Sequence, residues 1–211
     1  MPGVGAGKGD GRVLRGQRNR EAVVEALLGL VAEGHLNPTA KAIAERAGIS
    51  RRSVFQHFAD VESIYEAAGD RVGSALRPLL DPVDTSLPLA ARLQALVAER
   101  RALLAMVDPI ARAARLREPF SPQLQANRRH LTAMMRQQCR EAFAPELADR
   151  PSADAEQVGA ALAGAMSWSL YNHLCDDLGL GVEQALAVMT RLVAGVLQRG
   201  DLPLPEAAVP R

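Results

Sequence analysis

Hydrogen-bonding and cationic side chains are concentrated in the short segment Ser-Arg-Arg-Ser-Val-Phe-Gln-His-Phe, which runs from Ser50 to Phe58. A guanidinium presents a planar fork of donors, and a side-chain amide presents a donor beside an acceptor. Such groups can bond phosphate oxygens or two atoms on the edge of one base, where Arg matches guanine and Gln matches adenine. The chemistry available to this segment is therefore recognition of a duplex, provided that a rigid support presents the side chains.

The residues just before this segment predict a short helix that ends in a tight turn. Small and aliphatic side chains recur there at spacings of three and four, which places them on one buried face: Ala40, Ile43, Ala44 and Ala47. The Thr39 hydroxyl can accept from a free amide of the first turn, which makes Thr39 a suitable N-cap. Gly48 follows the last residue of the pattern, where a left-handed backbone costs glycine least.

A second helix is predicted to begin after Ser50, whose hydroxyl can cap it. We expect Val54, Phe55 and Phe58 to pack inward, which leaves the polar side chains of the segment on the outside. Two helices joined in this way form a helix-turn-helix, whose second helix enters the major groove of DNA. An ordinary surface helical hairpin is the alternative, and it would need the small-residue face, the glycine turn and the polar helix start to coincide by chance.

With these residues the sequence resembles the TetR family of bacterial transcription regulators. The resemblance covers roughly residues 18–70, and its most specific parts are Thr39, Ile-Ala-Glu-Arg-Ala-Gly-Ile-Ser at 43–50 and Val-Phe-Gln-His-Phe at 54–58. A helix expected over 18–33 and a fourth helix starting near Val61 also match. The resemblance implies an all-α fold with an N-terminal three-helix DNA-binding head and a C-terminal helical bundle for dimerisation and ligand binding.

Three positions depart from the pattern of the family. The family often has Tyr, a phosphate contact, where Phe55 stands, and Lys where Val61 stands. The position of Arg52 is often a small residue. Neither Phe55 nor Val61 can bond a phosphate, and Arg51 and Arg52 are available to supply attraction to the DNA backbone in their place.

The expected DNA contacts divide into two groups. Phosphate contacts are predicted for Arg18, Thr39, Arg51 and His57, with Ser50 at the helix start, and base-edge contacts for Arg52, Ser53 and Gln56. Charge supports this placement, because residues 1–58 contain nine basic and five acidic residues while the whole chain has a net charge of only +1. A basic N-terminal part on a more acidic remainder suits a protein that meets phosphate at one end.

The predicted organisation has four parts. Residues 1–16 are glycine-rich and basic and are expected to form a flexible arm, which could lie along a minor groove or simply be disordered. The DNA-binding domain is expected over 17–60, the ligand-binding and dimerisation domain over 61–200, and a flexible proline-rich tail over 201–211. Beyond the fourth helix, proline and apolar periodicity predict helices over 88–106, 109–116, 122–143, 154–178 and 182–199.

Two surfaces of the predicted bundle suggest partners. The helices over 154–178 and 182–199 are rich in small and aliphatic residues, so we expect them to form a homodimer interface, the alternative being a fully intramolecular core. Large or adaptable side chains on central helices could line a pocket for a small-molecule effector, although such side chains are also common in cores. The candidate ligand-binding residues are Met106, Met134, Met135, Cys139, Trp168, Tyr171 and Asn172.

The sequence does not favour an enzyme. It contains no Gly-x-Ser-x-Gly or His-Glu-x-x-His motif, and His173, Asp176 and Asp177 are expected to be surface charges near a helix end rather than metal ligands. We expect no cofactor, no metal and no membrane partner. Only two cysteines occur, far apart in apolar helical surroundings, and no signal peptide is visible, which is consistent with a reducing cytoplasm.

Three functional hypotheses follow. The first is a homodimeric, ligand-responsive repressor that binds a near-palindromic double-stranded DNA operator and is released by a small apolar effector. The second is a constitutive DNA-binding regulator without an effector. The third is an all-helical binding module that does not bind DNA, which a gel shift with DNA flanking its own gene would distinguish from the other two.

Overall fold

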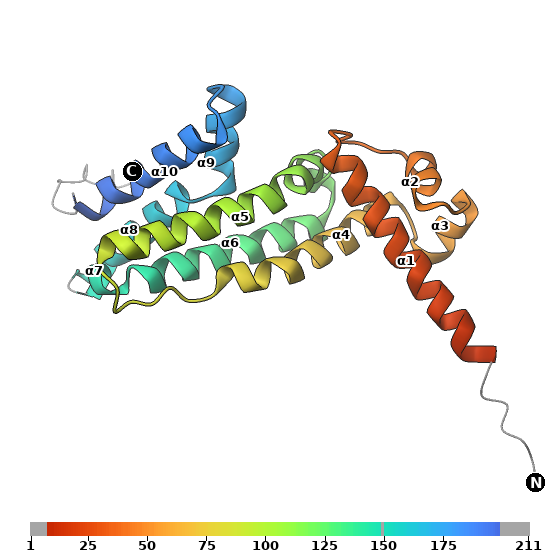
Figure 1. Ribbon diagram of the computed structural model, residues 1–211, viewed down its shortest axis with the longest axis horizontal. Coiled ribbons are helices and arrows are strands. Elements are labelled where there is room, and N and C mark those ends of the chain that lie inside the picture. The colour runs from red at the N-terminus through yellow and green to blue at the C-terminus, as the bar shows by residue number, and fades with distance from the viewer. Residues whose placement is uncertain (1–7, 149, 199–211) are drawn as a thin grey trace, which may run out of the picture. The chain divides into compact units, whose positions relative to one another are not determined.

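The computed structural model describes residues 8–148 and 150–198, with side chains from Val13 onward. Every regular element in this part of the chain is helical (Figure 1), so the all-α fold expected from the sequence is confirmed. The helices divide into two compact units. The first contains the described residues of Met1–Pro78 together with Leu103–Leu131, and the second contains those of Leu79–Ala102 and Thr132–Arg211.

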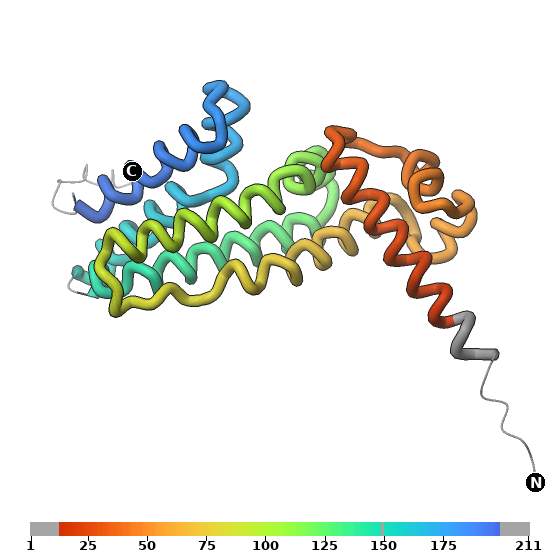
Figure 2. The backbone as a smooth tube through the Cα atoms, in the orientation of Figure 1, coloured from red at the N-terminus to blue at the C-terminus, as the bar shows by residue number. Residues whose placement is uncertain are grey.

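Four helices at the start of the chain build most of the first unit: α1 (Lys8–Ala32), α2 (Ala40–Ala47), α3 (Arg51–His57) and α4 (Val61–Leu76). α1 contacts each of the other three, and α2 contacts α3, as the path of the backbone shows (Figure 2). Each helix contributes fully buried side chains to a common apolar core, among them Leu27, Ile43, Val54 and Ile64. The core holds α3 by one side only, which leaves its other side to solvent.

The first helix begins earlier than the sequence indicated. Its start was expected near Arg18, but α1 begins at Lys8, so residues 8–16 of the expected arm are helical. Their glycines disfavour a helix, yet a helix that is already anchored by its buried face gains one hydrogen bond for each added residue without a new nucleation step. The rest of the expected arm, residues 1–7, and the expected tail, 201–211, lie outside the described residues.

The second unit contains the beginning of α5 (Leu89–Arg115), the end of α6 (Pro122–Ala142) and four further helices: α7 (Ala144–Ala148), α8 (Ser152–Ala165), α9 (Trp168–Asn172) and α10 (Val182–Gln198). α10 packs on α8 and α9. Short turns of other helical types complete the chain: η1 (Arg77–Leu80), η2 (Glu118–Phe120) and η3 (His173–Asp177). None of the helices within the described residues has both the length and the apolar character needed to cross a bilayer.

Two predicted helix boundaries in the later part of the chain are wrong. α5 does not end at Met106 but continues through Pro109 to Arg115. Pro109 costs one helix hydrogen bond and a clash with the carbonyl four residues earlier, but the turns on either side keep the helix together. The single helix expected over 154–178 is interrupted after Ala165. There the Ser167 hydroxyl accepts from the amide of Leu170 at 3.2 Å and starts α9 as a new N-cap.

Candidate nucleic-acid interface

Both helices of the predicted helix-turn-helix begin with the cap that the sequence indicated. The Thr39 hydroxyl accepts from the amide of Ala42 at 3.2 Å, and the Ser50 hydroxyl accepts from the amide of Ser53 at 3.1 Å. Each contact satisfies one of the free amides that a helix start leaves. The caps therefore fix where α2 and α3 begin, and with that the direction of the side chains on their first turns.

The turn between α2 and α3 depends on Gly48. Its backbone is left-handed, with φ 67° and ψ 25°, as the sequence predicted, and its amide donates to two carbonyls of the last turn of α2. This conformation is cheap for glycine and strained for a residue with a Cβ atom. Gly48 therefore ends α2 sharply enough for α3 to start at Arg51.

The two sides of α3 differ as a recognition helix requires. Val54 is fully buried, and Phe58, directly after the helix, is 3% exposed. The opposite side presents Arg51, Arg52 and Gln56 to solvent, with Ser53 and His57 half-buried beside them. The most versatile hydrogen-bonding groups of α3 are thus the ones that a duplex could reach.

Phe55 does not pack inward as expected. Its side chain is 40% exposed, and the guanidinium of Arg51 lies 5.6 Å from the centre of its ring. Val54 and Phe58 are four residues apart and fill the buried side of α3, whereas Phe55 is rotated by about 100° from Val54 and lies beside that face. The ring can restrict the conformations of Arg51 through a cation–π contact.

Arg20 of α1 holds the end of α3. Its Nη1 donates to the carbonyl of His57 at 2.9 Å, and its guanidinium lies 4.3 Å from the centre of the Phe58 ring. At Gly16, one turn earlier, α1 also passes close to His57, because a Cβ atom there would be in ordinary van der Waals contact with its ring, at 3.6 Å. α1 therefore supports α3 along its length and at its C-terminal end.

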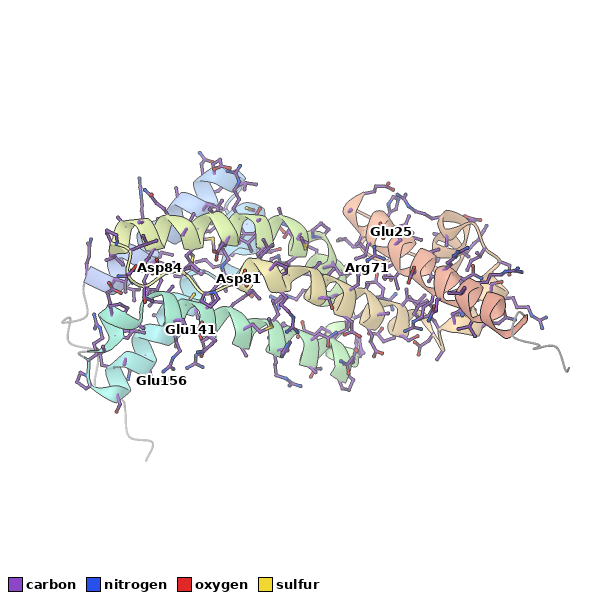
Figure 3. The ribbon with its side chains drawn as sticks, turned by 60° about the horizontal axis from the view of Figure 1, so that its bottom comes forward. Glu25, Arg71, Asp81, Asp84, Glu141 and Glu156 are labelled. Atoms are coloured by element: carbon purple, nitrogen blue, oxygen red, sulfur yellow. The ribbon has the colours of Figure 1, made fainter. Side chains whose placement is uncertain are left out.

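Ion pairs fasten α1 to α2 and to α4. Arg46 donates to Glu33 at 2.7 Å, and this hydrogen bond lowers the pKa of Glu33. Arg71 pairs with Glu25 at 2.6 Å between α4 and α1, and both are labelled in Figure 3. All four side chains are largely exposed, so these pairs contribute little to stability and mainly neutralise cations away from α3.

The connector between α1 and α2 (residues 33–39) is held by side chains from later in the chain. The Tyr65 hydroxyl donates to the carbonyl of Leu36 at 3.3 Å, and Arg117 donates to Asn37 at 2.6 Å. Arg117 also lies 4.7 Å from the centre of the Tyr65 ring and 3.5 Å from a carboxylate oxygen of Glu62. This cluster joins the connector, α4 and the turn after α5 within the first unit.

The arginines on the exposed side of the helix-turn-helix are not used in ion pairs within the described part of the protein. Arg18, Arg51 and Arg52 form no ion pair with any described residue, and all three are exposed. Cations that already have a carboxylate partner gain less from a phosphate, because they must give up the first contact. The positive charge expected to meet DNA is thus available on α1 and α3.

The solved structures with a similar fold include the following two. A transcriptional regulator from Rhodococcus sp. Rha1 matches with a TM-score of 0.67 at 19% sequence identity, over 85% of this chain and 96% of that chain. A protein described as a candidate TetR-family transcriptional regulator from Mesorhizobium loti MAFF303099 matches with a TM-score of 0.54 at 18% identity, over 88% and 96%. This chain therefore shares the all-α fold of these two regulators. No protein-family model and no curated protein matches its sequence.

The side chains that the sequence suggested for effector binding differ in exposure. Met135, Cys139 and Tyr171 are buried, Met134, Trp168 and Asn172 are half-buried, and Met106 is 41% exposed. Met106 belongs to the first unit and the other six to the second. Their role in ligand binding stays a prediction.

His173 and Asp177 form the surface pair that their spacing suggested. The Nδ1 atom of His173 lies 2.7 Å from an oxygen of Asp177, and both side chains are more than half exposed. No group of three or more potential metal-binding side chains occurs among the described residues.

The sequence pattern did not indicate two residues that position the helix-turn-helix. Arg20 and Arg117 act through a backbone carbonyl and through aromatic rings, and no local pattern marks such contacts. Arg20 had one usable signal, because it precedes the apolar stripe of α1 by one turn on the side that carries Val23 and Leu27.

Proposed function

We propose that this protein is a DNA-binding transcriptional regulator, most simply a repressor, that binds a near-palindromic operator as a homodimer and acts in the cytoplasm. The observation that carries the proposal is the exposed, unpaired side of α3, with Arg51, Arg52 and Gln56 on a helix that Ser50 caps and Arg20 holds. The TetR fold supports it. The functional division into a DNA-binding part over 17–60 and a ligand-binding and dimerisation part over 61–200 belongs to the same proposal.

The contacts are divided by chemistry. Arg18, Thr39, Arg51 and His57 contact phosphates, and Arg52, Ser53 and Gln56 contact base edges. Phosphate contacts set the register of α3 in the groove without selecting a sequence, and base contacts select it. Phe55 lacks the hydroxyl that would bond a phosphate, so Arg51, which lies over its ring, supplies that attraction.

A small, largely apolar effector binds the second unit and releases the protein from its operator. Such a ligand acts by binding more tightly to a conformation in which the spacing of the two recognition helices no longer suits the DNA. Buried Met135, Cys139 and Tyr171 are the side chains best suited to contact it.

The test of DNA binding starts from a random pool of duplexes, from which the purified full-length protein selects its operator. Binding to the selected duplex is then measured by fluorescence anisotropy at several salt concentrations, because each phosphate contact adds about 0.9 to the slope of log K against log salt. Arg51→Ala should reduce that slope by about one. Arg71→Ala removes an exposed arginine from α4, where it is paired with Glu25, and is the matched control that should leave the slope unchanged.

Failure to enrich any sequence would contradict operator recognition. Loss of all salt-sensitive binding would contradict DNA binding itself and leave a helical binding module. Once an operator is known, a screen for small molecules that release it separates the ligand-responsive regulator from the constitutive one.

A further inference from the structure

Two arginines of α5 are almost completely buried. Arg92 is 4% exposed and Arg100 is 1% exposed, and they lie four residues on either side of Leu96, which is fully buried. All three are therefore on one face of the helix, within the second unit. Removing a guanidinium from water is costly unless its charge is paired and its N–H groups are bonded. The partners of the two arginines consequently decide what each one does.

Arg92 is neutralised by the protein. Its Nη1 and Nη2 donate to the two carboxylate oxygens of Glu146, with a distance of 2.8 Å for Nη1. Its Nε donates to the carbonyl of Leu87 at 2.9 Å, and Nη1 also donates to the carbonyl of Ala142. Every nitrogen of Arg92 has a partner, and a negative charge lies directly in its fork.

No described carboxylate lies in the fork of Arg100, although Glu99 is close enough to favour its charged form. Its Nη2 donates to the side-chain oxygen of Gln138 at 3.3 Å and lies 3.9 Å from the sulfur of Cys139. Its Nε and Nη1 have no hydrogen-bond partner in residues 8–148 and 150–198. Burial lowers the pKa of the Arg100 guanidinium, because these contacts replace water incompletely.

Gln138 is fixed so that it faces Arg100 with its oxygen. Its Nε2 donates to Glu99 at 2.7 Å and to the carbonyls of Leu79 and Asp81 at 3.3 and 3.4 Å. These acceptors determine the orientation of the amide and leave only Oε1 for Arg100. The carboxylate of Glu99 is therefore engaged by Gln138, while two nitrogens of Arg100 stay free.

We propose that Arg100 anchors the carboxylate of a small-molecule effector whose remaining surface is apolar. A carboxylate is the preferred partner of a guanidinium and would supply both the missing charge and the missing acceptors. Met135 and Cys139 lie four residues apart on the buried side of α6, with Cys139 beside Arg100, so the side chains around the anchor are apolar and buried. The inference rests on the ligand response proposed above and names the chemical class of the ligand.

The binding test uses the full-length protein and two matched pairs of probes, octanoate with methyl octanoate and phenylacetate with methyl phenylacetate. Isothermal titration calorimetry should show that at least one acid binds about tenfold or more tightly than its ester, because the ester cannot form the charged hydrogen bonds. A hundredfold excess of that acid over its Kd should raise the Tm by about 5–10 °C. Arg100→Met should reduce the affinity for the acid to that for the ester.

A second measurement needs no ligand. Arg100→Met replaces a buried cation that has no carboxylate in its fork by an apolar side chain of similar length, so the Tm of the free protein should stay the same or rise. Arg92→Met is the matched control, and it should lower the Tm, because it leaves Glu146 without its partner. A comparable fall in Arg100→Met would show that Arg100 is neutralised through Gln138 and Glu99, and would overturn the proposal.

Operator release distinguishes this proposal from the function on which it rests. Acids that bind in an Arg100-dependent way without releasing DNA would support the carboxylate site and contradict the ligand response. Acids that bind no better than their esters, or equally well to Arg100→Met, would overturn the carboxylate site. In that case, release of the operator by an uncharged apolar probe would still support a ligand-responsive regulator.

Discussion

The guanidinium of Arg20 lies 4.3 Å from the centre of the Phe58 ring and donates to the carbonyl of His57 at 2.9 Å. One side chain of α1 thus holds the last residue of α3 and the buried residue that follows it. Because α3 is only two turns long, its orientation depends on such contacts more than on its own hydrogen bonds.

Arg20→Met should therefore weaken operator binding because α3 is held less firmly, not because a phosphate contact is lost. The variant keeps the aliphatic stem and loses the cation–π contact and the hydrogen bond, so we expect a loss of about 1–2 kcal/mol in the free energy of unfolding. Urea denaturation measures this loss, and anisotropy measures the DNA affinity. An unchanged unfolding free energy with a reduced salt slope would instead identify Arg20 as a phosphate contact.

Gly48→Ala isolates the cost of the turn. A Cβ atom at Gly48 would have no heavy atom within 4 Å, so the left-handed φ of 67° is the only source of strain. The expected destabilisation is about 1–2 kcal/mol by urea denaturation. Gly73→Ala is the matched control, because Gly73 lies inside α4 with equally open surroundings. This substitution should stabilise the protein by about 0.5–1 kcal/mol. Equal effects at the two positions would contradict a conformational origin.

Arg52→Ala tests the assignment of base contacts. If Arg52 forks onto a base, the variant should lose about 1–3 kcal/mol of affinity for the operator and tolerate every base at one position. Competition between single-base operator variants measures this change in preference. An equal loss for all duplexes, with a smaller salt slope, would show that Arg52 contacts only phosphate.

The helix-turn-helix could be predicted closely because its determinants are local. Thr39, Gly48 and Ser50 act on amides and carbonyls within a few residues, so their roles are visible in the sequence. Phe55 was placed wrongly, because the apolar pattern of a seven-residue helix does not say which of two adjacent apolar residues faces the core. Local contacts thus predict where α2 and α3 begin and end better than they predict which face of α3 is buried.

Contacts between distant segments were harder to foresee. Arg100 was not recognised as buried, although its position four residues after Leu96 places it in the apolar stripe of α5. That spacing is a signal that the sequence contains. Whether such an arginine has a carboxylate partner depends on α6 and α7, and only the structure distinguishes Arg100 from Arg92 in this respect.

The pair of Arg92 and Glu146 should make stability depend on pH. The hydrogen bond from Arg92 holds the pKa of Glu146 below the usual glutamate value of 4.5. The contribution of Glu146 to the free energy of unfolding is therefore fully present above pH 4.5 and is lost as the pH falls through the lowered pKa. Glu146→Gln should cost about 1–3 kcal/mol at neutral pH. The difference from the wild type, measured by urea denaturation, should shrink below pH 4.5. A difference that is constant down to pH 2–3 would mean that the charge of Glu146 does not matter.

The proposed dimer interface can be tested on α8 and α10. These helices contact each other and still present small and aliphatic side chains to solvent, including Ala160, Ala161, Ala187 and Leu192, the last of which is 44% exposed. Burying a glutamate without a partner in an apolar interface is costly, so Leu192→Glu should shift the protein toward monomers in sedimentation velocity at micromolar concentration. Operator affinity should fall as well, because two recognition helices no longer bind together.

Leu178→Glu is the matched control, since Leu178 is 57% exposed and follows η3 outside both helices. A wild-type monomer would contradict the proposed homodimer, and a dimer that persists in Leu192→Glu but dissociates in Leu178→Glu would place the interface elsewhere.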